Sequence, residues 1–271
     1  MSTLAGLHRD LTRHRELTLG LVRRELFSPF AGSAFGVAWA LLHPLLLMGV
    51  YLLVFTFVFT GGRFGGGSAG LDYQSFMLSG MVAWMGWSAL LGSACNAVTG
   101  SASLVKQADF PTEVLPLRTV FGVLVPHLVG LVVVMAWVLL RFQIVPWTWA
   151  LLPLAVLIQS VGMLAVAYLL GALCVFVRDV KEVVTVFTAV GIFLAPVFYT
   201  PATEQGLPAV LRWAVLLNPF SHFVHMYRDC LFSGAIEHPV SWAVCVGLAV
   251  PGCLLGRRAF DRLKLFFGNF L

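Results

Sequence analysis

Six apolar stretches dominate the chain, and none of them contains Asp, Glu, Lys or Arg. They cover residues 34–62, 73–105, 119–140, 142–177, 183–203 and 238–256. A helix needs about 20 apolar residues to cross the ~30 Å hydrocarbon layer of a bilayer. Hydrocarbon offers no partner to backbone N–H and C=O groups, so continuous apolar runs of this length are typical of membrane-spanning helices. The pattern therefore predicts an all-α integral membrane protein.

The runs predict six transmembrane helices in a single domain, residues 1–271. The expected spans are roughly 34–60, 74–98, 119–140, 149–177, 183–199 and 238–255. Two further apolar segments, 207–217 and 220–232, are too short to cross, and such segments are typical of re-entrant helices. Asn218-Pro219 opens the second of them with a capping residue followed by proline at the first helical position. We therefore expect two short re-entrant helices within an external segment, 200–237, between spans five and six.

The segment before the first span has a different pattern. Between residues 4 and 28, leucines recur at helical spacing among Arg and Glu; they are Leu4, Leu7, Leu11, Leu17 and Leu21. A helix with such a pattern lies in the plane of the membrane surface. The pattern predicts an N-terminal amphipathic interfacial helix within residues 1–33.

The basic residues are divided unequally between the two sides of the membrane. With the N-terminus, the 101–118 segment, the 178–182 loop and the 256–271 tail on one side, that side holds 13 of the 17 Lys and Arg residues. The positive-inside rule makes it the cytoplasmic side, with both termini inside. The net charge of +5 is thus assigned to the membrane surface and not to nucleic acid.

Several absences narrow the function. Charged residues are missing from the middle of every expected span, which argues against ion coupling. None of the three lysines, Lys106, Lys181 and Lys264, follows a glycine, so no phosphate-binding P-loop is present and any ATP and Mg²⁺ would belong to another chain. His222 and His225 share a helix face without a placed third ligand, so we expect a structural pair and no metal or other cofactor in this chain.

One stripe in the second span favours close helix packing. Small or aromatic residues recur there every four positions, with an amide available for a hydrogen bond between helices; they are Gly80, Trp84, Ser88, Gly92, Asn96 and Gly100. Packing is the favoured interpretation, and a direct contact with substrate is the alternative.

Several segments together resemble a known family. They are 23–46 (RRELFSPFAGSAFGVAWALLHPLL), 104–117 (LVKQADFPTEVLPL), 175–183 (VFVRDVKEV), 193–199 (FLAPVFY), 217–220 (LNPF) and 227–229 (YRD). In order and spacing they resemble the permease subunit of type-2 ATP-binding-cassette transporters that export polysaccharide, such as O-antigen, teichoic acid or capsule. The resemblance implies a homodimer in the bacterial inner membrane, two separate ATPase subunits and a lipid-linked glycan substrate.

The resemblance also implies roles for particular residues. Segment 104–117 would be the coupling segment that fits into the ATPase, with the contact candidates Lys106, Gln107, Asp109, Phe110 and Glu113. An ordinary solvated loop is the alternative. Arg23 and Arg24 would meet the anionic head group of the substrate, because the guanidinium fork suits phosphate. General attraction to anionic membrane lipid is an equal alternative.

Aromatic residues offer flat surfaces to sugar rings along a translocation path. The candidates are Trp84, Trp87, Phe198 and Tyr199, with core or lipid-facing packing as the alternative for each. Two other functions stay open. One is a related ATP-driven exporter of a drug or small lipid. The other is a membrane-embedded enzyme that modifies a glycan or lipid, for which only the 222–238 region offers side chains.

Overall fold

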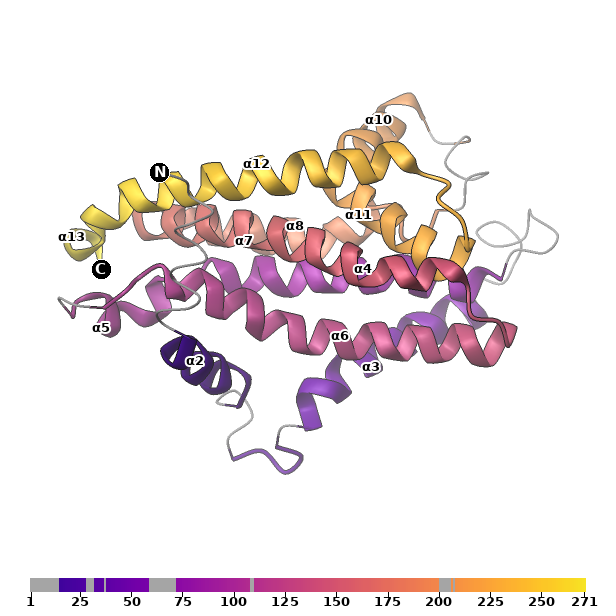
Figure 1. The fold of residues 1–271 in the computed structure, drawn as a ribbon, viewed down its shortest axis with the longest axis horizontal. Coiled ribbons are helices and arrows are strands. Elements are labelled where there is room, and N and C mark those ends of the chain that lie inside the picture. The colour runs from indigo at the N-terminus through magenta and orange to yellow at the C-terminus, as the bar shows by residue number, and fades with distance from the viewer. Residues whose placement is uncertain are drawn as a thin grey trace.

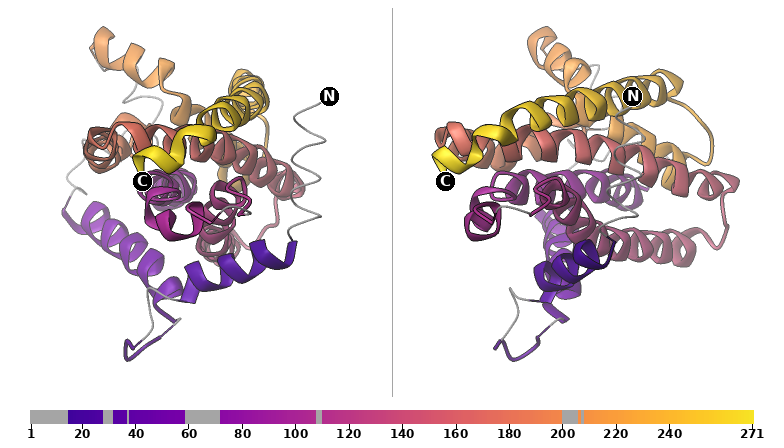
Figure 2. Two further views of the ribbon diagram at one scale, coloured as in Figure 1. Left: turned by 90° about the vertical axis from the view of Figure 1, so that its left-hand side faces the viewer. Right: turned by 60° about the vertical axis from the view of Figure 1, so that its left-hand side comes forward.

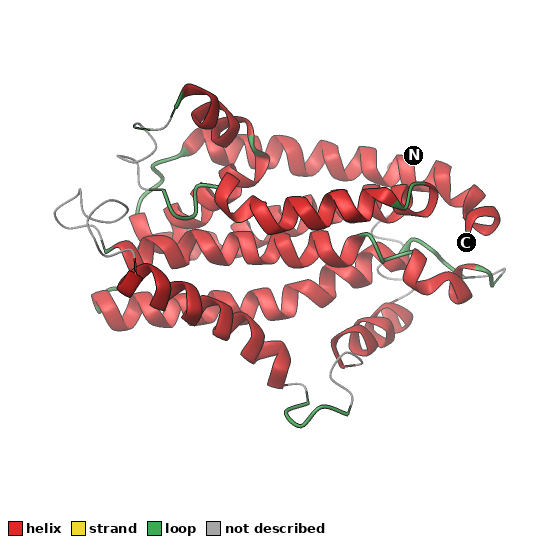
Figure 3. Cartoon of the chain, turned by 180° about the vertical axis from the view of Figure 1, so that it is seen from behind, coloured by secondary structure: helices red, strands yellow, loops and turns green. Residues whose placement is uncertain are grey.

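The structure is a computed structural model that describes residues 15–27, 32–36, 38–58, 72–107, 110–199, 206 and 208–271. All regular elements in these ranges are helical (Figure 3). The α-helices are α2 (Arg15–Phe27), α3 (Ala38–Leu53), α4 (Tyr73–Ala94), α5 (Ala102–Val105), α6 (Val114–Phe142), α7 (Leu152–Phe176), α8 (Asp179–Leu194), α10 (Ala209–Leu217), α11 (Pro219–Arg228), α12 (Pro239–Leu263) and α13 (Phe267–Phe270). Short π-helical turns follow α3 (Val54–Val58) and α11 (Asp229–Ser233), and 3₁₀ turns cover Thr99–Ser101, Trp147–Leu151 and Lys264–Phe266.

Four helical stretches are long and apolar enough to cross a membrane. They are Tyr73–Ala94, Val114–Phe142, Trp147–Phe176 and Pro239–Phe270. Their helices α4, α6, α7 and α12 run side by side along the long axis of the molecule (Figure 1). The chain is therefore a multi-pass membrane protein, and the expected second, third, fourth and sixth spans are confirmed as long apolar helices.

The other two expected spans are shorter in the structure. α3 and α8 have 16 residues each. A helix of that length is about 24 Å long, which is less than the ~30 Å hydrocarbon layer. The five-residue π turn Val54–Val58 continues directly from α3, so α3 comes closer to the required length than α8 does. The structure thus supports four spans by length, and the count of six stays a prediction.

α4 lies at the centre of the packing and is buried along most of its length. The ring of Trp84 meets Phe187 and Phe220 edge to face, with centroids 6.2 and 5.7 Å away. Trp87 meets Phe220 and Phe223 in the same way, at 5.1 and 4.9 Å. Offset and edge-to-face contacts of this kind stabilise aromatic pairs beyond their burial. They join α4 to both α8 and α11.

α11, in the segment between α8 and α12, begins where the sequence predicts. Asn218 Oδ1 accepts a hydrogen bond of 3.1 Å from the Phe220 N–H, and Pro219 occupies the first turn of α11. The Asn-Pro start is therefore confirmed. α10 and α11 have nine and ten residues, so each is shorter than a span.

α2 lies crosswise to the long helices at one end of the bundle (Figure 2). Its two buried residues, Thr18 and Val22, are one turn apart and on the side that packs against α6. Leu17 and Leu19 are exposed. A helix is thus present over residues 15–27, its position in the membrane surface stays a prediction, and the leucines before residue 15 lie outside the described residues.

A glycine in α12 allows close contact with α7. A Cβ built on Gly256 lies 2.7 Å from the carbonyl oxygen of Ala165, whereas one on Gly247 in the same helix meets nothing within 4 Å. We expect Gly256→Ala to destabilise the protein by about 1–3 kcal/mol, because the obstructing atom belongs to backbone. Gly247→Ala is the matched control and should unfold at or above the wild-type temperature, because alanine favours a helix more than glycine does. Thermal unfolding of the purified protein in detergent measures both, and equal stability of the two variants would contradict the packing.

Candidate functional site

A polar cavity of about 460 Å³ lies at the end of the bundle where α2 crosses. It is bounded by α2, by the end of α4 with the turns that follow, and by the start of α6. The lining residues are Leu21, Arg24, Glu25, Ser93, Asn96, Ala97, Gly100, Ser101, Ser103, Leu104 and Arg118. Two guanidinium groups, one carboxylate, three hydroxyls and an amide line this cavity, so it suits a polar group.

Arg118 on α6 connects the elements that bound this cavity, α2 and the turn after α4. Its Nη2 atom donates to Ser101 Oγ at 2.8 Å, and its Nε lies 3.0 Å from Glu25 Oε2. The Nε–H is not aligned on that carboxylate oxygen, so charge and not a hydrogen bond joins these two atoms. Gly122, one turn further along α6, lies beside the Glu25 side chain, and a Cβ there would make an ordinary contact at 3.5 Å from Glu25 Cγ. The ion pair fixes α2 on α6.

The Glu25 carboxyl faces Arg118 from a partly buried position. Burial raises the pKa of this carboxyl, and the nearby Arg118 charge opposes that rise. A carboxyl with a raised pKa is held less firmly in its charged form. The cavity therefore combines two guanidinium groups with one weakly held negative charge.

The two arginines expected to meet a head group differ in position. Arg24 lines the cavity. Arg23 is exposed, and its guanidinium carbon lies 5.9 Å from the centre of the Phe27 ring on α2 itself. The sequence alone did not single out Arg118, because its role depends on contacts with residues 17 and 93 positions away.

In the segment between α4 and α6, two of the expected coupling residues are exposed, and two others contact the rest of the chain. Lys106 and Gln107 are exposed just after α5. Phe110 packs against a buried cluster formed by α6, α7, α12 and α13, and Glu113 faces α12. Asp109 lies outside the described residues. The structure thus separates exposed residues of this segment from those that anchor it.

Glu113 belongs to a charged network at the end of α12. It pairs with Lys264, and Arg257 Nη2 lies 3.9 Å away. Arg257 is almost fully buried and donates to Asp261 Oδ2 and to the Tyr168 hydroxyl, both at 2.9 Å. Segment 110–113 is therefore tied to α12 and, through Tyr168, to α7.

The four candidate path aromatics are packed within the protomer to different degrees. Trp84 and Trp87 are buried in the contacts of α4 described above. Phe198 is also buried and stacks on Phe55 with centroids 4.2 Å apart. Tyr199 is partly exposed, and its hydroxyl donates to the Phe193 carbonyl at 2.8 Å. The structure brings Phe198 and Tyr199 together near the end of α8, apart from the tryptophan cluster.

Arg228 is a buried residue whose role only the structure reveals. Its guanidinium donates to the carbonyls of Pro196 and Val197, which follow α8, the latter at 2.8 Å. It also lies over the Phe76 ring at 3.6 Å. A Cβ on Gly80 would come within 3.1 Å of Arg228 Nη2, so this glycine makes room for the guanidinium. Arg228 therefore joins α11 to the end of α8 and to α4.

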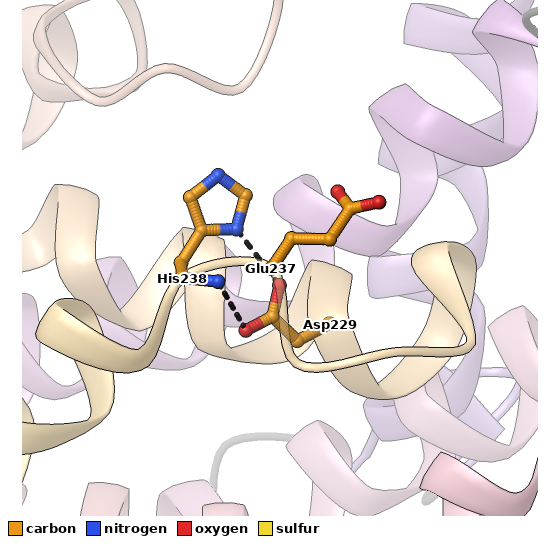
Figure 4. Close-up of side chains that lie close together, drawn as sticks. All are labelled: Asp229, Glu237 and His238. Carbon is orange, nitrogen blue, oxygen red and sulfur yellow. Dashed lines mark hydrogen bonds and ion pairs between the residues drawn. The ribbon is translucent and has the colours of Figure 1, made fainter.

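The neighbouring Asp229 anchors the start of α12 (Figure 4). Its buried carboxylate accepts hydrogen bonds from the His238 N–H at 3.1 Å, from His238 Nδ1 at 2.8 Å and from Trp242 Nε1 at 3.0 Å. Asp229, Glu237 and His238 place ligand atoms within 4.8 Å of one another, which is close enough for a metal. Because three donors already occupy the Asp229 carboxylate, the cluster fits a cap on α12 better than a metal site.

The histidines offered for an enzymatic site are engaged in contacts. His222 Nδ1 lies 3.1 Å from Ser241 Oγ, and its Nε2 lies 3.1 Å from the Leu216 carbonyl. The ring of His225 stacks on that of His238 with centroids 4.4 Å apart. This arrangement favours the structural interpretation of the pair.

The fold and the cavity define a class, a multi-pass helical membrane protein with a polar pocket, lined by two arginines and a glutamate, at one end of the helical bundle. The family description "ABC-2 type transporter" matches residues 16–232, and the chain belongs to that family. It is 31% identical over 226 residues to the O-antigen export system permease protein RfbA of Myxococcus xanthus, which covers 83% of this chain and 84% of that protein. Two proteins of the same name from Klebsiella pneumoniae are each 21% identical, over 259 and 260 residues, covering 94% of this chain and 95% of theirs.

The Glu113 network predicts that segment 110–113 contributes to stability. We expect Glu113→Ala to lower the free energy of unfolding by about 1.5–3 kcal/mol, because it removes a charged hydrogen-bond partner from Lys264 and leaves Arg257 less well compensated. Lys106→Ala, an exposed change in the same segment, should leave stability unchanged. Thermal unfolding in detergent compares them, and a wild-type unfolding temperature for Glu113→Ala would show that the network does not hold the segment.

Proposed function

We propose that this chain is the membrane permease subunit of an ATP-driven exporter that moves lipid-linked polysaccharide across the bacterial inner membrane. The observation that carries the proposal is the family match over most of the chain together with relatives named as O-antigen export permeases. The substrate would be a glycan of O-antigen, teichoic acid or capsule type. ATP and Mg²⁺ would bind to a separate ATPase subunit, and this chain would catalyse no reaction.

The proposed topology has six spans, with both termini in the cytoplasm. α3 and α8 would complete the six, and α10 and α11 would be re-entrant from the external side. Support comes from the clustering of α5, α13 and the C-terminus at the same end of the bundle where α2 crosses (Figure 1). That end also carries most of the Lys and Arg residues of the expected cytoplasmic segments.

Two ATPase subunits would dock on the segment between α4 and α6 in each copy of a homodimer. Lys106 and Gln107 are exposed and would make the direct contacts, with Asp109 between them and the anchored part of the segment. Phe110 and Glu113 would transmit the movement, because their contacts tie the segment to α7 and α12. Binding of ATP in the partner would thus act on two spans at once.

The polar cavity beneath α2 would receive the anionic head group of the lipid-linked substrate. Arg24 and Arg118 line it and offer charged donors to phosphate. Arg23, which is exposed on the same helix, would attract the lipid to the surface. The glycan would then pass between two copies of the chain. Tyr199, which is partly exposed, would lie closer to that path than Phe198, Trp84 and Trp87, which are buried within one protomer.

Docking of the ATPase predicts an effect of charge reversal at Lys106. We expect Lys106→Glu to weaken association with the ATPase about tenfold or more, because reversed charge across an interface is strongly unfavourable. Arg212→Glu, an equally exposed reversal in α10, is the control. Co-purification of the ATPase with a tagged permease measures both. Undiminished co-purification of Lys106→Glu, or loss with Arg212→Glu as well, would contradict the assignment of this segment.

The proposed topology predicts a difference in chemical access between the same two positions. All five native cysteines are buried, so a new cysteine provides the reactive thiol. We expect Arg212→Cys to react with a membrane-impermeant maleimide in cells whose outer membrane alone is permeabilised. Lys106→Cys should react only after the inner membrane is opened. Reaction of both positions under the first condition would overturn the placement of α5 in the cytoplasm.

A further inference from the structure

Two buried thiols meet where α4 and α7 end. Cys95 is the residue that follows α4, and Cys174 lies in the last turn of α7. Both side chains are almost completely buried, and their thiols are hydrogen-bonded to each other. Both cysteines are free, so the structure holds two sulfur atoms in contact without a covalent bond between them. Neither thiol belongs to the polar cavity or to the Glu113 network.

The helix backbones are also close at this point. Gly171 lies about one turn before Cys174 on α7. A Cβ built on this glycine would lie 3.7 Å from the carbonyl oxygen of Ala94 and 3.7 Å from the Cβ of Ala97. Ala94 and Ala97 flank Cys95 in the chain. A disulfide joins Cα atoms that are about 4.4–6.8 Å apart, so it requires backbones in contact, and the packing at Gly171 supplies that contact.

The backbone at Cys95 is not part of a regular helix. α4 ends at Ala94, and the chain continues in turns as far as the 3₁₀ turn Thr99–Ser101. The Thr99 hydroxyl donates to the Cys95 carbonyl at 3.2 Å. Backbone at the end of a helix opens and adjusts more easily than the helix interior. The turn at Cys95 can therefore supply the small shift that converts two thiols in contact into a disulfide.

Charge and access both concern Cys95. Lys181, in the first turn of α8, is exposed and interacts electrostatically with both thiols. Burial raises the pKa of the Cys95 thiol, whereas the hydrogen bond to Cys174 and the Lys181 charge oppose that rise. Asn96 and Ala97, next in the chain, line the polar cavity, so small polar molecules can approach this turn. The pair is closed to bulky reagents and reacts slowly with small ones.

We propose that Cys95 and Cys174 form an oxidation site, at which a small peroxide such as hydrogen peroxide converts the two thiols into a reversible disulfide. The Cys95 sulfur, as thiolate, first attacks one peroxide oxygen. The O–O bond breaks, and the released hydroxide takes up the thiol proton to give water, leaving a sulfenic acid. The Cys174 sulfur then attacks the Cys95 sulfur. The S–O bond breaks, and hydroxide leaves with the Cys174 proton as a second water, so that two electrons have passed from sulfur to peroxide.

The disulfide would fasten the end of α4 to the end of α7. The chain continues from Cys95 through α5 to segment 110–113, which is already tied to α7 and α12. The connection between α4 and α6 would therefore be held against α7 at both of its ends. Where the proposed function holds, the bond would stop transport that needs a movement of this connection relative to α7.

Thiol mapping in the full-length protein tests the site. Native membranes that contain the protein are exposed to hydrogen peroxide, the remaining thiols are alkylated after denaturation, and the digested chain is analysed by mass spectrometry without reduction. We expect a peptide with Cys95 linked to a peptide with Cys174, and dithiothreitol should separate them. Cys230, Cys245 and Cys253 are internal controls, because they are equally buried but have no thiol partner among the described residues. Alkylation of both Cys95 and Cys174 after peroxide, or links among the controls at equal yield, would overturn the proposal.

Thermal unfolding in detergent provides a second readout. The oxidised wild type should unfold several degrees above the reduced protein, because a disulfide that closes a long loop restricts the unfolded chain. Cys95→Ser should show no such rise, and Cys174→Ala replaces it if that variant does not fold. An unchanged unfolding temperature after the bond has formed would show that the bond does not fit the native contact.

Export is a separate readout, and it rests on the proposed function. Oxidation should abolish ATP-driven export by the wild-type permease–ATPase complex, and dithiothreitol should restore it. Cys95→Ser with the same ATPase should keep its export in peroxide, which controls for oxidation of the ATPase. Full export by a permease whose disulfide has formed would contradict the locking of α4 to α7. A chain that exports nothing in the reduced state would contradict the proposed function, and thiol mapping would still decide on the site.

Discussion

The hydrocarbon layer offers no hydrogen-bonding partner, and this constraint shapes the molecule beyond its helical backbone. Each polar group carried into the bundle needs a partner within the protein. Arg228 finds it in the carbonyls of Pro196 and Val197, where the backbone leaves α8. Thr148 Oγ1 donates to the Cys230 carbonyl at 2.7 Å, in the π turn after α11. The irregular backbone between α8 and α12 is thus held by side chains from distant parts of the chain.

A second consequence is that the helices approach one another through glycines. Apolar side chains gain little from leaving lipid for protein, so close packing takes the place of hydrophobic burial. Gly256 brings α12 against α7, and Gly191 brings α8 against the ring of Trp84. The Glu113 network joins the ends of α7 and α12. A force applied to segment 110–113 would therefore act on both helices together.

The sequence by itself determined the class of the protein, because the length of an apolar run sets whether a helix can cross a bilayer. The long apolar helices α4, α6, α7 and α12 and the Asn-Pro start of α11 follow from local pattern and are confirmed, although α12 continues to Leu263, beyond the expected end of its span at residue 255. We expected the stripe of small and aromatic residues on α4 to pack against other helices along its whole length. Gly80 packs closely, whereas Asn96 lines the polar cavity instead.

The tertiary structure decided which charges meet, since such pairs join residues far apart in the chain. Glu113 and Lys264 are 151 positions apart, and no periodicity in the sequence predicts that contact. The tertiary structure also places Arg24, and not its neighbour Arg23, in the lining of the polar cavity. It leaves Lys106 exposed and turns Glu113 toward α12. Local pattern fixes helices through backbone hydrogen bonding, whereas cavities and ion pairs arise only where several helices converge.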